Sequence, residues 1–349
     1  KMLFTRDRDF YKNFFSLASI IVLQNVIVLS VNLADNLMIG GYSETALSGV
    51  AAVNQIQFVF QQIIMAVGDS LVVIGSQYWG QKRISPVKSL GAAALSVGLL
   101  FGAVLFAASV AFPDLLIGIF TPSHAIVSEG VKYIGIIKYT YLIFAVTNIL
   151  LALLRTTETV KISFFVSLSA LITNCSINYI LIEGRFGAPA LGVRGAAIGT
   201  LAARSVELVI VVLYVFLADK KLKITAEGLF NIDVALAADY VKNCIFFVIV
   251  AAMFGCSTAL QTVILGHMND NAIAANSIAS TLFQILKVAS VGAASATAVI
   301  IGKTIGSGKL EKLREYVKTL QILFLIIGFA TSVLLFLLRM PILSLYDIT

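Results

Sequence analysis

Long stretches without a charged side chain recur along this sequence. Six of them run for about 20 residues or more, and three others of similar length contain only a few ionisable residues. A helix needs about 20 mostly apolar residues to cross the hydrocarbon core of a bilayer. The chain is 59% hydrophobic and 12% charged, whereas soluble proteins average about 25% charged residues. We therefore predict an all-α, polytopic helical membrane protein.

The stretches predict nine spans and a division into two lobes. The spans are residues 13–34, 45–68, 89–113, 129–154, 162–182, 191–218, 243–269, 271–302 and 319–338. The polar segments between them are too short to hold a soluble domain. We expect residues 1–218 to form a first lobe of six spans and residues 219–239 to form a cytoplasmic linker. Residues 240–349 then form three spans of a second lobe.

The positions of Lys and Arg predict the orientation. With a cytoplasmic N-terminus, the inner segments contain seventeen of these residues, and the outer segments contain only Lys132, Arg185, Arg194 and Arg339. Short loops rich in Lys and Arg stay on the cytoplasmic side. We predict a multi-pass protein of the plasma membrane with its N-terminus in the cytoplasm. The net charge of +7 then reflects orientation, and no nucleic acid partner is expected.

An internal repeat supports the two-lobe division. A shift of 226 residues places Ile39-Gly40 on Leu265-Gly266, Val73-Ile74 on Val299-Ile300, and Gly80 on Gly306. The identities are few, but the order of spans, turns and basic loops also repeats. Six spans separate the two copies, so the repeats are parallel, as in some secondary transporters. If each repeat has six spans, the second stops after three, which gives two pseudo-symmetric lobes of 6 + 3 spans.

A carboxylate in the first predicted span needs an explanation. Asp at the bilayer centre costs about 2.5–3.5 kcal/mol on insertion scales. Asp35 lies in the outer half of the span, and Asn32 shares its helical face. A carboxylate among amides predicts a site for Na⁺ or a proton. The alternative is an Asp that caps the outer end of the helix.

Other polar side chains inside the spans suggest further sites. Asn174 and Asn178 are one turn apart in the fifth span, and Thr200 lies in the sixth. Their oxygens suit a hard cation, although such residues also join helices by hydrogen bonds. Arg204 and Glu207 are three residues apart in the sixth span, and we favour a structural ion pair over a transport role.

The second and eighth spans also carry polar groups. Gln55, Gln62 and Asp69 follow a heptad spacing in the second span, which predicts either a cavity lining or hydrogen bonds between helices. Lys287 has no partner on its own helix in the eighth span, so we consider it a pathway residue. No Ser/His/Asp set and no His/Cys cluster with ligand spacing is present. We expect no enzymatic activity and no metal site beyond one for Na⁺.

Three motifs together resemble a known family. They are Val31–Gly40 (VNLADNLMIG), Gly75–Gly80 (GSQYWG) and Pro189–Thr200 (PALGVRGAAIGT). The chain resembles bacterial multidrug and toxic compound extrusion (MATE) transporters over essentially its whole length. The resemblance implies twelve spans in two six-helix lobes around a central cleft, of which the last three would be absent here.

The resemblance also implies residue roles. It assigns the cation site of the first lobe to Asp35, Asn174, Asn178 and Thr200. Some members of the family carry a carboxylate where Asn178 stands, which leaves Na⁺ and H⁺ both open as the coupling ion. Gln261 occupies the repeat position of Asp35, so we expect no matching carboxylate in the second lobe. The residues that we assign to the substrate pathway are Asn32, Gln55, Gln62, Asp69, Gln261 and Lys287.

We therefore predict a secondary active exporter of small cationic or amphipathic molecules. It would act as a monomer in the lipid bilayer by alternating access, with Na⁺ or H⁺ as the coupling ion and no other cofactor. One alternative is a lipid-linked oligosaccharide flippase of the same superfamily, which would need cationic groups along the cleft. Another is a non-transporting membrane scaffold or receptor, which would leave the polar residues of the first two spans without a role.

Overall fold

The computed structural model describes residues 4–225, 232–266 and 270–345, and these contain only helices and loops. Nine helices among them are long and apolar enough to cross a membrane, as predicted. The elements are α1 (Arg8–Tyr42), α2 (Glu44–Gly80), α3 (Ile84–Ala111), α4 (Pro113–Gly118), α5 (His124–Ile137), α6 (Tyr139–Thr156), α7 (Lys161–Leu181), the 3-10 turn η1 (Arg185–Gly187), α8 (Val193–Leu213), the π-turn η2 (Tyr214–Ala218), α9 (Val234–Gly266), α10 (Asp270–Gly306) and α11 (Leu310–Leu345).

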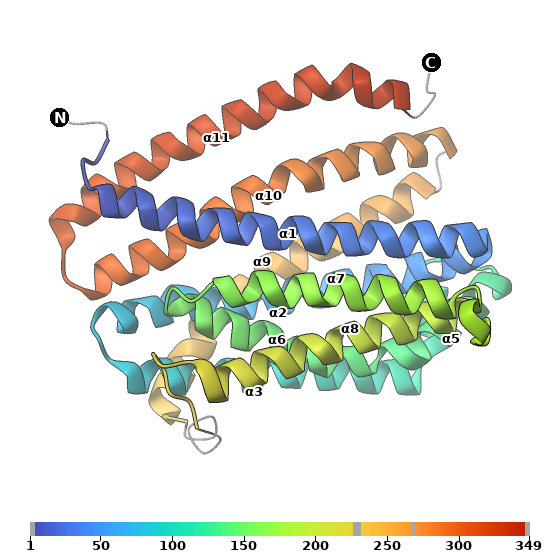
Figure 1. The fold of residues 1–349 in the computed structure, drawn as a ribbon, viewed down its shortest axis with the longest axis horizontal. Helices are drawn as coiled ribbons and strands as arrows, with labels where there is room; N and C mark the ends of the chain where they lie inside the picture. Colours follow the sequence, from blue (N-terminus) through green and yellow to red (C-terminus); the bar gives the residue numbers. More distant parts are fainter. Residues whose placement is uncertain (1–3, 226–231, 267–269, 346–349) are drawn as a thin grey trace.

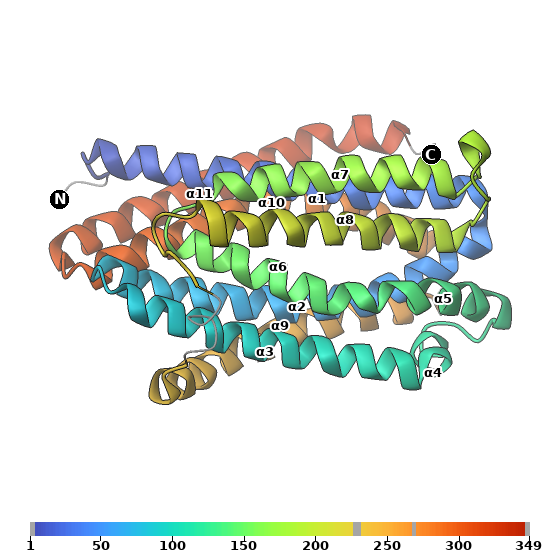
Figure 2. The same ribbon diagram turned by 60° about the horizontal axis from the view of Figure 1, so that its bottom comes forward.

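The helices form a bundle along one long axis, with the loops gathered at its two ends (Figure 1). Helix α2 is central and packs against α3, α5, α6, α9 and α10. Helix α1 packs against both α7 and α10, and α11 lies on α10 at the edge of the bundle (Figures 1 and 2). Large side chains such as Met253 on α9 and Phe329 on α11 are 68% and 74% exposed. Exposure of such large apolar side chains is unfavourable in water, whereas contact with lipid is not.

The fourth predicted span, residues 129–154, is not one helix. It consists of α5 and α6, which meet at Lys138. The hydroxyl of Thr140 is buried there and donates a hydrogen bond of 2.7 Å to the carbonyl of Ile137. A side chain that bonds a carbonyl of the preceding turn competes with the helical ladder and bends the helix. Hydropathy could not predict this break, because it depends only on how apolar the residues are.

The predicted linker, residues 219–239, is shorter than expected. Helix α9 begins at Val234, so the last six residues of that range are helical. The carboxylate of Asp233 accepts hydrogen bonds from the backbone N–H groups of Ala235 at 3.0 Å and Leu236 at 3.2 Å. Asp is a favoured N-cap residue for this reason. Residues 226–231 of the predicted linker lie outside the described residues.

The helix boundaries confirm the internal repeat. Helices α1, α2 and α3 begin at residues 8, 44 and 84, and adding 226 gives residues 234, 270 and 310, which begin α9, α10 and α11. Helices α2 and α10 also end at equivalent glycines, Gly80 and Gly306. The three helices α1–α3 therefore correspond to α9–α11.

The two repeats meet through these glycines. A Cβ atom on Gly80 would lie 2.2 Å from the carbonyl oxygen of Lys303, and one on Gly306 would lie 1.8 Å from that of Gln77. Residues 77 and 303 also differ by 226, so the same contact is made from both sides. We call this end of the bundle the inner end, because the segments predicted to be cytoplasmic lie there (Figure 1).

Candidate functional site

Asp35 lies in a chain of polar side chains in the first lobe. The amide nitrogen of Asn178 donates to Asp35 Oδ1 and also to Asn174 Oδ1 at 3.3 Å. The amide nitrogen of Asn174 in turn donates to the hydroxyl of Thr200 at 3.3 Å. The four residues that the sequence suggested for a cation site are therefore in contact, on α1, α7 and α8.

Close packing of α7 and α8 brings these residues together. A Cβ atom on Gly195 would lie 2.6 Å from the carbonyl oxygen of Leu181, and one on Gly199 would lie 2.0 Å from Asn178 Oδ1. Two glycines four residues apart let membrane helices approach closely. The spacing Gly195-x-x-x-Gly199 was visible in the sequence. It could have predicted that α8 lies against the face of α7 that carries both Asn residues.

The amide of Asn178 has an unused acceptor. Asn178 and Asn174 are fully buried, and Asn178 Oδ1 has no hydrogen-bond partner. A buried polar atom without a partner costs free energy, so this oxygen would gain from a group that donates a proton or carries positive charge. Rotation of this amide by half a turn would exchange its nitrogen and oxygen. An oxygen would then point to Asp35, which is favourable only when the carboxylate is protonated or a cation lies between them.

Asp35, Asn174 and Thr200 line a small cavity of about 60 Å³. One water needs roughly 10–15 Å³ of such volume, so the cavity has room for a partly hydrated ion. Its other walls come from α1, α2, α5, α7 and α8. The remaining lining residues are Val28, Val31, Asn32, Asn54, Gln57, Gln61, Tyr133, Ser167, Ala170, Ala203, Arg204 and Glu207.

Arg204 is the cation nearest to this site, and it has its own counter-ion. Its guanidinium lies 2.7 Å from Glu207 Oε2, and the Glu207 side chain is only 7% exposed. The guanidinium also lies over the ring of Phe144, 5.1 Å from its centroid. The structure therefore confirms the ion pair between Arg204 and Glu207. Because Glu207 neutralises Arg204, the carboxylate of Asp35 remains available to another cation.

The polar residues of α2 are arranged differently from the predicted stripe. The cavity is lined by Asn54, Gln57 and Gln61, and among the described residues Gln55 and Gln62 are not part of this wall. Asp69 lies further toward the inner end and forms an ion pair of 3.2 Å with Arg155. Arg155 also donates to the hydroxyl of Ser295 on α10 at 3.4 Å. Arg155 thus joins the two lobes, and its counter-ion Asp69 does not belong to the Asp35 cavity.

Lys287 and Gln261, two other predicted pathway residues, are also separate from the Asp35 cavity. The ammonium of Lys287 lies 4.4 Å from the ring centroid of Phe254 on α9 and 5.9 Å from that of Phe283 on its own helix. These aromatic contacts are the partners that the sequence did not reveal. Gln261 is an exposed residue of α9. Asn32 is the one predicted pathway residue that lines the cavity with Asp35.

Tyr133 is a cavity residue that the sequence reasoning missed. It is 3% exposed and lines the cavity from α5. Tyr133 lies within the fourth predicted span, residues 129–154. An aromatic residue is common in a membrane span and does not by itself indicate a binding site. No spacing rule singles it out, because its neighbours Asp35 and Thr200 are far away in the sequence. Its position depends on how α5 packs against α2 and α8.

Comparisons with known proteins agree with this architecture. The sequence model of the family described as MatE matches residues 21–180 and 249–348. A probable multidrug resistance protein NorM of Thermotoga maritima is 29% identical over 184 residues, which are 52% of this chain and 39% of that protein. A protein of the same description from Streptococcus pneumoniae is 27% identical over 91% of this chain and 70% of its own length.

A solved structure has the same fold. It is a MOP superfamily transporter from Pyrococcus furiosus, with a TM-score of 0.83 and 18% sequence identity. The alignment covers 97% of this chain and 74% of that one. The chain thus spans about 39% to 74% of the lengths of these three proteins.

Proposed function

The chain belongs to the MatE family, and on that premise we propose that it is a secondary active exporter of small cationic or amphipathic molecules. The family is one of multi-pass membrane transporters, and the chain is not an enzyme. Two relatives are described as probable multidrug resistance proteins, which supports efflux of more than one drug. The coupling ion in this proposal is Na⁺ or H⁺, bound at Asp35.

One observation carries the proposal. Asp35 faces buried amide and hydroxyl groups in a cavity where the only neighbouring guanidinium among the described residues, that of Arg204, is already paired. A carboxylate in such surroundings gains a large stabilisation from a proton or from a cation bound by oxygen atoms. Because the two lobes differ at this position, ion binding would act on the first lobe.

Helix α1 is the element that would carry the effect of the ion to the second lobe. It holds Asp35 near its outer end and packs against α10 further along. A Cβ atom on Gly292 of α10 would lie only 2.5 Å from Val22 of α1, so the two helices are in close contact. A change in position of α1 would therefore alter the contact between the lobes. Alternating access requires such a coupling between a local charge and a two-state element.

We place the inner end in the cytoplasm, as the distribution of basic residues favours. The two repeats are in contact at that end through Gly80 and Gly306, and a closed inner end is one of the two states that alternating access needs. Binding of a proton or Na⁺ at Asp35, with rotation of the Asn178 amide, would change the free-energy difference between this state and one in which the lobes separate there.

The test is gradient-driven efflux from vesicles that contain the purified chain, with a fluorescent organic cation as substrate. Sodium and proton gradients are imposed separately. We expect one of them to drive efflux, and we expect Asp35→Asn to lower the rate about 10–100-fold, since a hydrogen bond or contact to a charged group is worth about 1.5–3 kcal/mol. Asp35→Asn should still insert normally, because the amide is less costly in the membrane than the carboxylate.

Asp114→Asn is the matched control. Asp114 is an exposed acid of α4, outside the cavity, so its variant should transport like the unmodified chain. Undiminished gradient-driven efflux by Asp35→Asn would contradict the role of Asp35. Absence of efflux by the unmodified chain under both gradients would contradict the exporter itself and favour a non-transporting scaffold.

A further inference from the structure

A second, larger cavity lies at the inner end, between the two lobes. Its volume is about 550 Å³. The first lobe contributes the start of α1, the loop from α6 to α7, η2 and the residues that follow it. The second lobe contributes Lys303 near the end of α10. A ligand in this cavity would therefore touch both lobes.

The lining of this cavity is basic. Four lysines, Lys161, Lys220, Lys221 and Lys303, face two acids, Glu158 and Asp219. Such an excess of positive charge next to a membrane surface attracts anionic groups.

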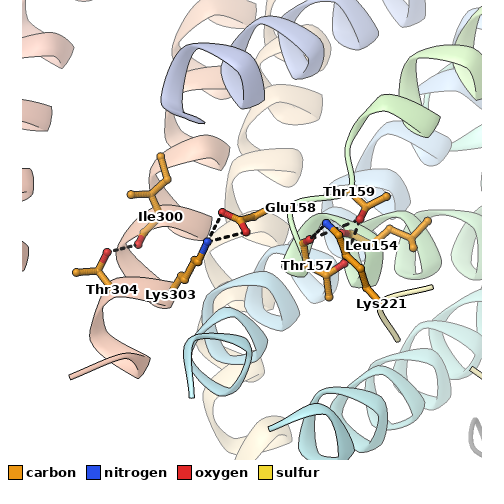
Figure 3. A network of polar contacts seen from close by, with 8 residues as sticks. All are labelled: Leu154, Thr157, Glu158, Thr159, Lys221, Ile300, Lys303 and Thr304. Atoms are coloured by element: carbon orange, nitrogen blue, oxygen red, sulfur yellow. Dashed lines mark hydrogen bonds and ion pairs between the residues drawn. The ribbon is translucent and has the colours of Figure 1, made fainter. Parts of the chain in front are cut away.

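Both acids already have partners. Lys303 Nζ lies 2.9 and 2.8 Å from the two carboxylate oxygens of Glu158 (Figure 3). The carboxylate of Asp219 accepts backbone hydrogen bonds from Lys221 at 3.4 Å and from Leu222 at 2.8 Å. Glu158 is thus paired with Lys303, and one carboxylate charge, that of Asp219, remains for the other three lysines.

Two of the lysines have no counter-ion. Among the described residues, no carboxylate lies within 4.0 Å of the ammonium group of Lys161 or Lys220, both of which are exposed. Lys221 instead donates to the backbone carbonyl of Thr157 (Figure 3). Loss of hydration lowers the pKa of Lys221, so a nearby anion would stabilise its charged form.

The rest of the cavity wall suits a molecule with both a polar and an apolar part. Leu17, Ile20 and Val160 are apolar, and Ser16 and Thr159 supply hydroxyl groups. The orientation rule explains why the inner segments are basic. It does not require that the lysines of three separate segments meet at one cavity with an apolar wall.

We propose that this cavity binds the phosphate of an anionic lipid headgroup, with Lys161 and Lys220 as its main contacts. The apolar residues Leu17 and Ile20 of α1 and Val160 before α7 would contact the glycerol and the first carbons of the acyl chains. Phosphate is the common chemistry of this lipid and of soluble phosphate compounds. Because Lys303 belongs to the second lobe, occupancy would stabilise the contact between the lobes at the inner end.

The test measures binding of dioctanoyl phosphatidylglycerol to the 349-residue chain in a non-ionic detergent, by native mass spectrometry. Dioctanoyl phosphatidylcholine is the neutral comparison, and inorganic phosphate is the soluble one. We expect phosphatidylglycerol to bind more tightly than phosphatidylcholine. Each lysine removed, in Lys161→Gln and Lys220→Gln, should weaken binding about fivefold, and the double variant about 25-fold.

The matched control is the double variant Lys242→Gln with Lys318→Gln. It removes the same charge from exposed positions of α9 and α11 that do not line the cavity. Equal affinity for the two lipids, or equal affinity of the two double variants, would overturn the proposal. Displacement of the lipid by millimolar inorganic phosphate would support the site and show that phosphate alone is sufficient for binding. Binding that also requires the acyl chains would support the site and identify the lipid as its ligand.

Discussion

The two repeats are alike where their backbones pack and different where their chemistry lies. Helices α1–α3 and α9–α11 start at equivalent positions, and the residues before α1 and α9, Asp7 and Asp233, both accept hydrogen bonds from the first turn. The glycines at the ends of α2 and α10 make the same close contact. By contrast, Asp35 of α1 corresponds to Gln261 of α9.

This difference separates two kinds of constraint on the sequence. The contact between the two repeats needs a small residue in each of them. The backbone of one repeat occupies the space that a side chain on the other repeat would fill. A coupling site needs only one titratable or cation-binding group to connect ion binding with lobe movement. Substitutions of equivalent packing residues in the two repeats should therefore have similar effects. A substitution of a polar residue in the first repeat should have no counterpart in the second.

The largest effect should come from the glycines at the inner end. Gly306→Ala and Gly80→Ala each place a Cβ atom against a backbone carbonyl, at 1.8 and 2.2 Å. Backbone cannot move as a side-chain tip can, so we expect each variant to lose about 2–3 kcal/mol of stability. Thermal unfolding of the purified protein measures the loss.

Gly328→Ala is the control for the glycine variants. Gly328 lies within α11, and a Cβ atom there would meet nothing within 4 Å. Alanine favours helix more than glycine does, so this variant should be neutral or slightly stabilised. If only one of Gly80→Ala and Gly306→Ala lost stability and the other were as stable as the control, the two repeats would not be equivalent at this contact.

The next effect concerns the polar chemistry of the first lobe alone. Gly199→Ala would place a Cβ atom 2.0 Å from Asn178 Oδ1, which forces the amide away from Asp35. We expect gradient-driven efflux to fall about tenfold, from the loss of one hydrogen bond to a charged group. Vesicle efflux assays at several concentrations of the coupling ion measure it. Full efflux at the same ion concentration would show that the Asn178 amide does not take part in coupling.

The sequence predicted the Asp35 site more completely than the rest of the polar residues, for a physical reason. Asn174 and Asn178 share one helical face and a buried Asp demands polar neighbours, so spacing and the cost of charge burial marked each as a candidate. Only the resemblance to the MATE family placed them in one site with Asp35 and Thr200. Helix α2 carries amides on several faces, and spacing alone could not tell which face meets the cavity. That choice depends on the packing of α5 and α8, which also brings Tyr133 into the site.

The smallest effect should distinguish the two equivalent N-cap residues. Asp7 Oδ2 also lies 2.7 Å from Lys312 Nζ and 2.6 Å from the hydroxyl of Tyr316, so it joins the first repeat to α11. The hydrogen bond from Lys312, followed by that from Tyr316, lowers the pKa of Asp7 from 3.8 to about 2. The carboxylate therefore contributes stability above about pH 4, and this contribution is lost as the pH falls toward 2.

Asp7→Asn keeps a good N-cap and removes only the charge. Because Lys312 is 51% exposed, solvent screening limits the expected loss of stability at pH 7 to about 1 kcal/mol. The difference between the variant and the unmodified chain should shrink below pH 4 and vanish only below pH 2, as followed by thermal unfolding. Asp233→Asn is the comparison at the equivalent position, where the carboxylate accepts only the backbone hydrogen bonds of the cap among the described residues. A pH-independent effect of Asp7→Asn would mean that Asp7 acts only as a cap, and the two repeats would then be equivalent at this position too.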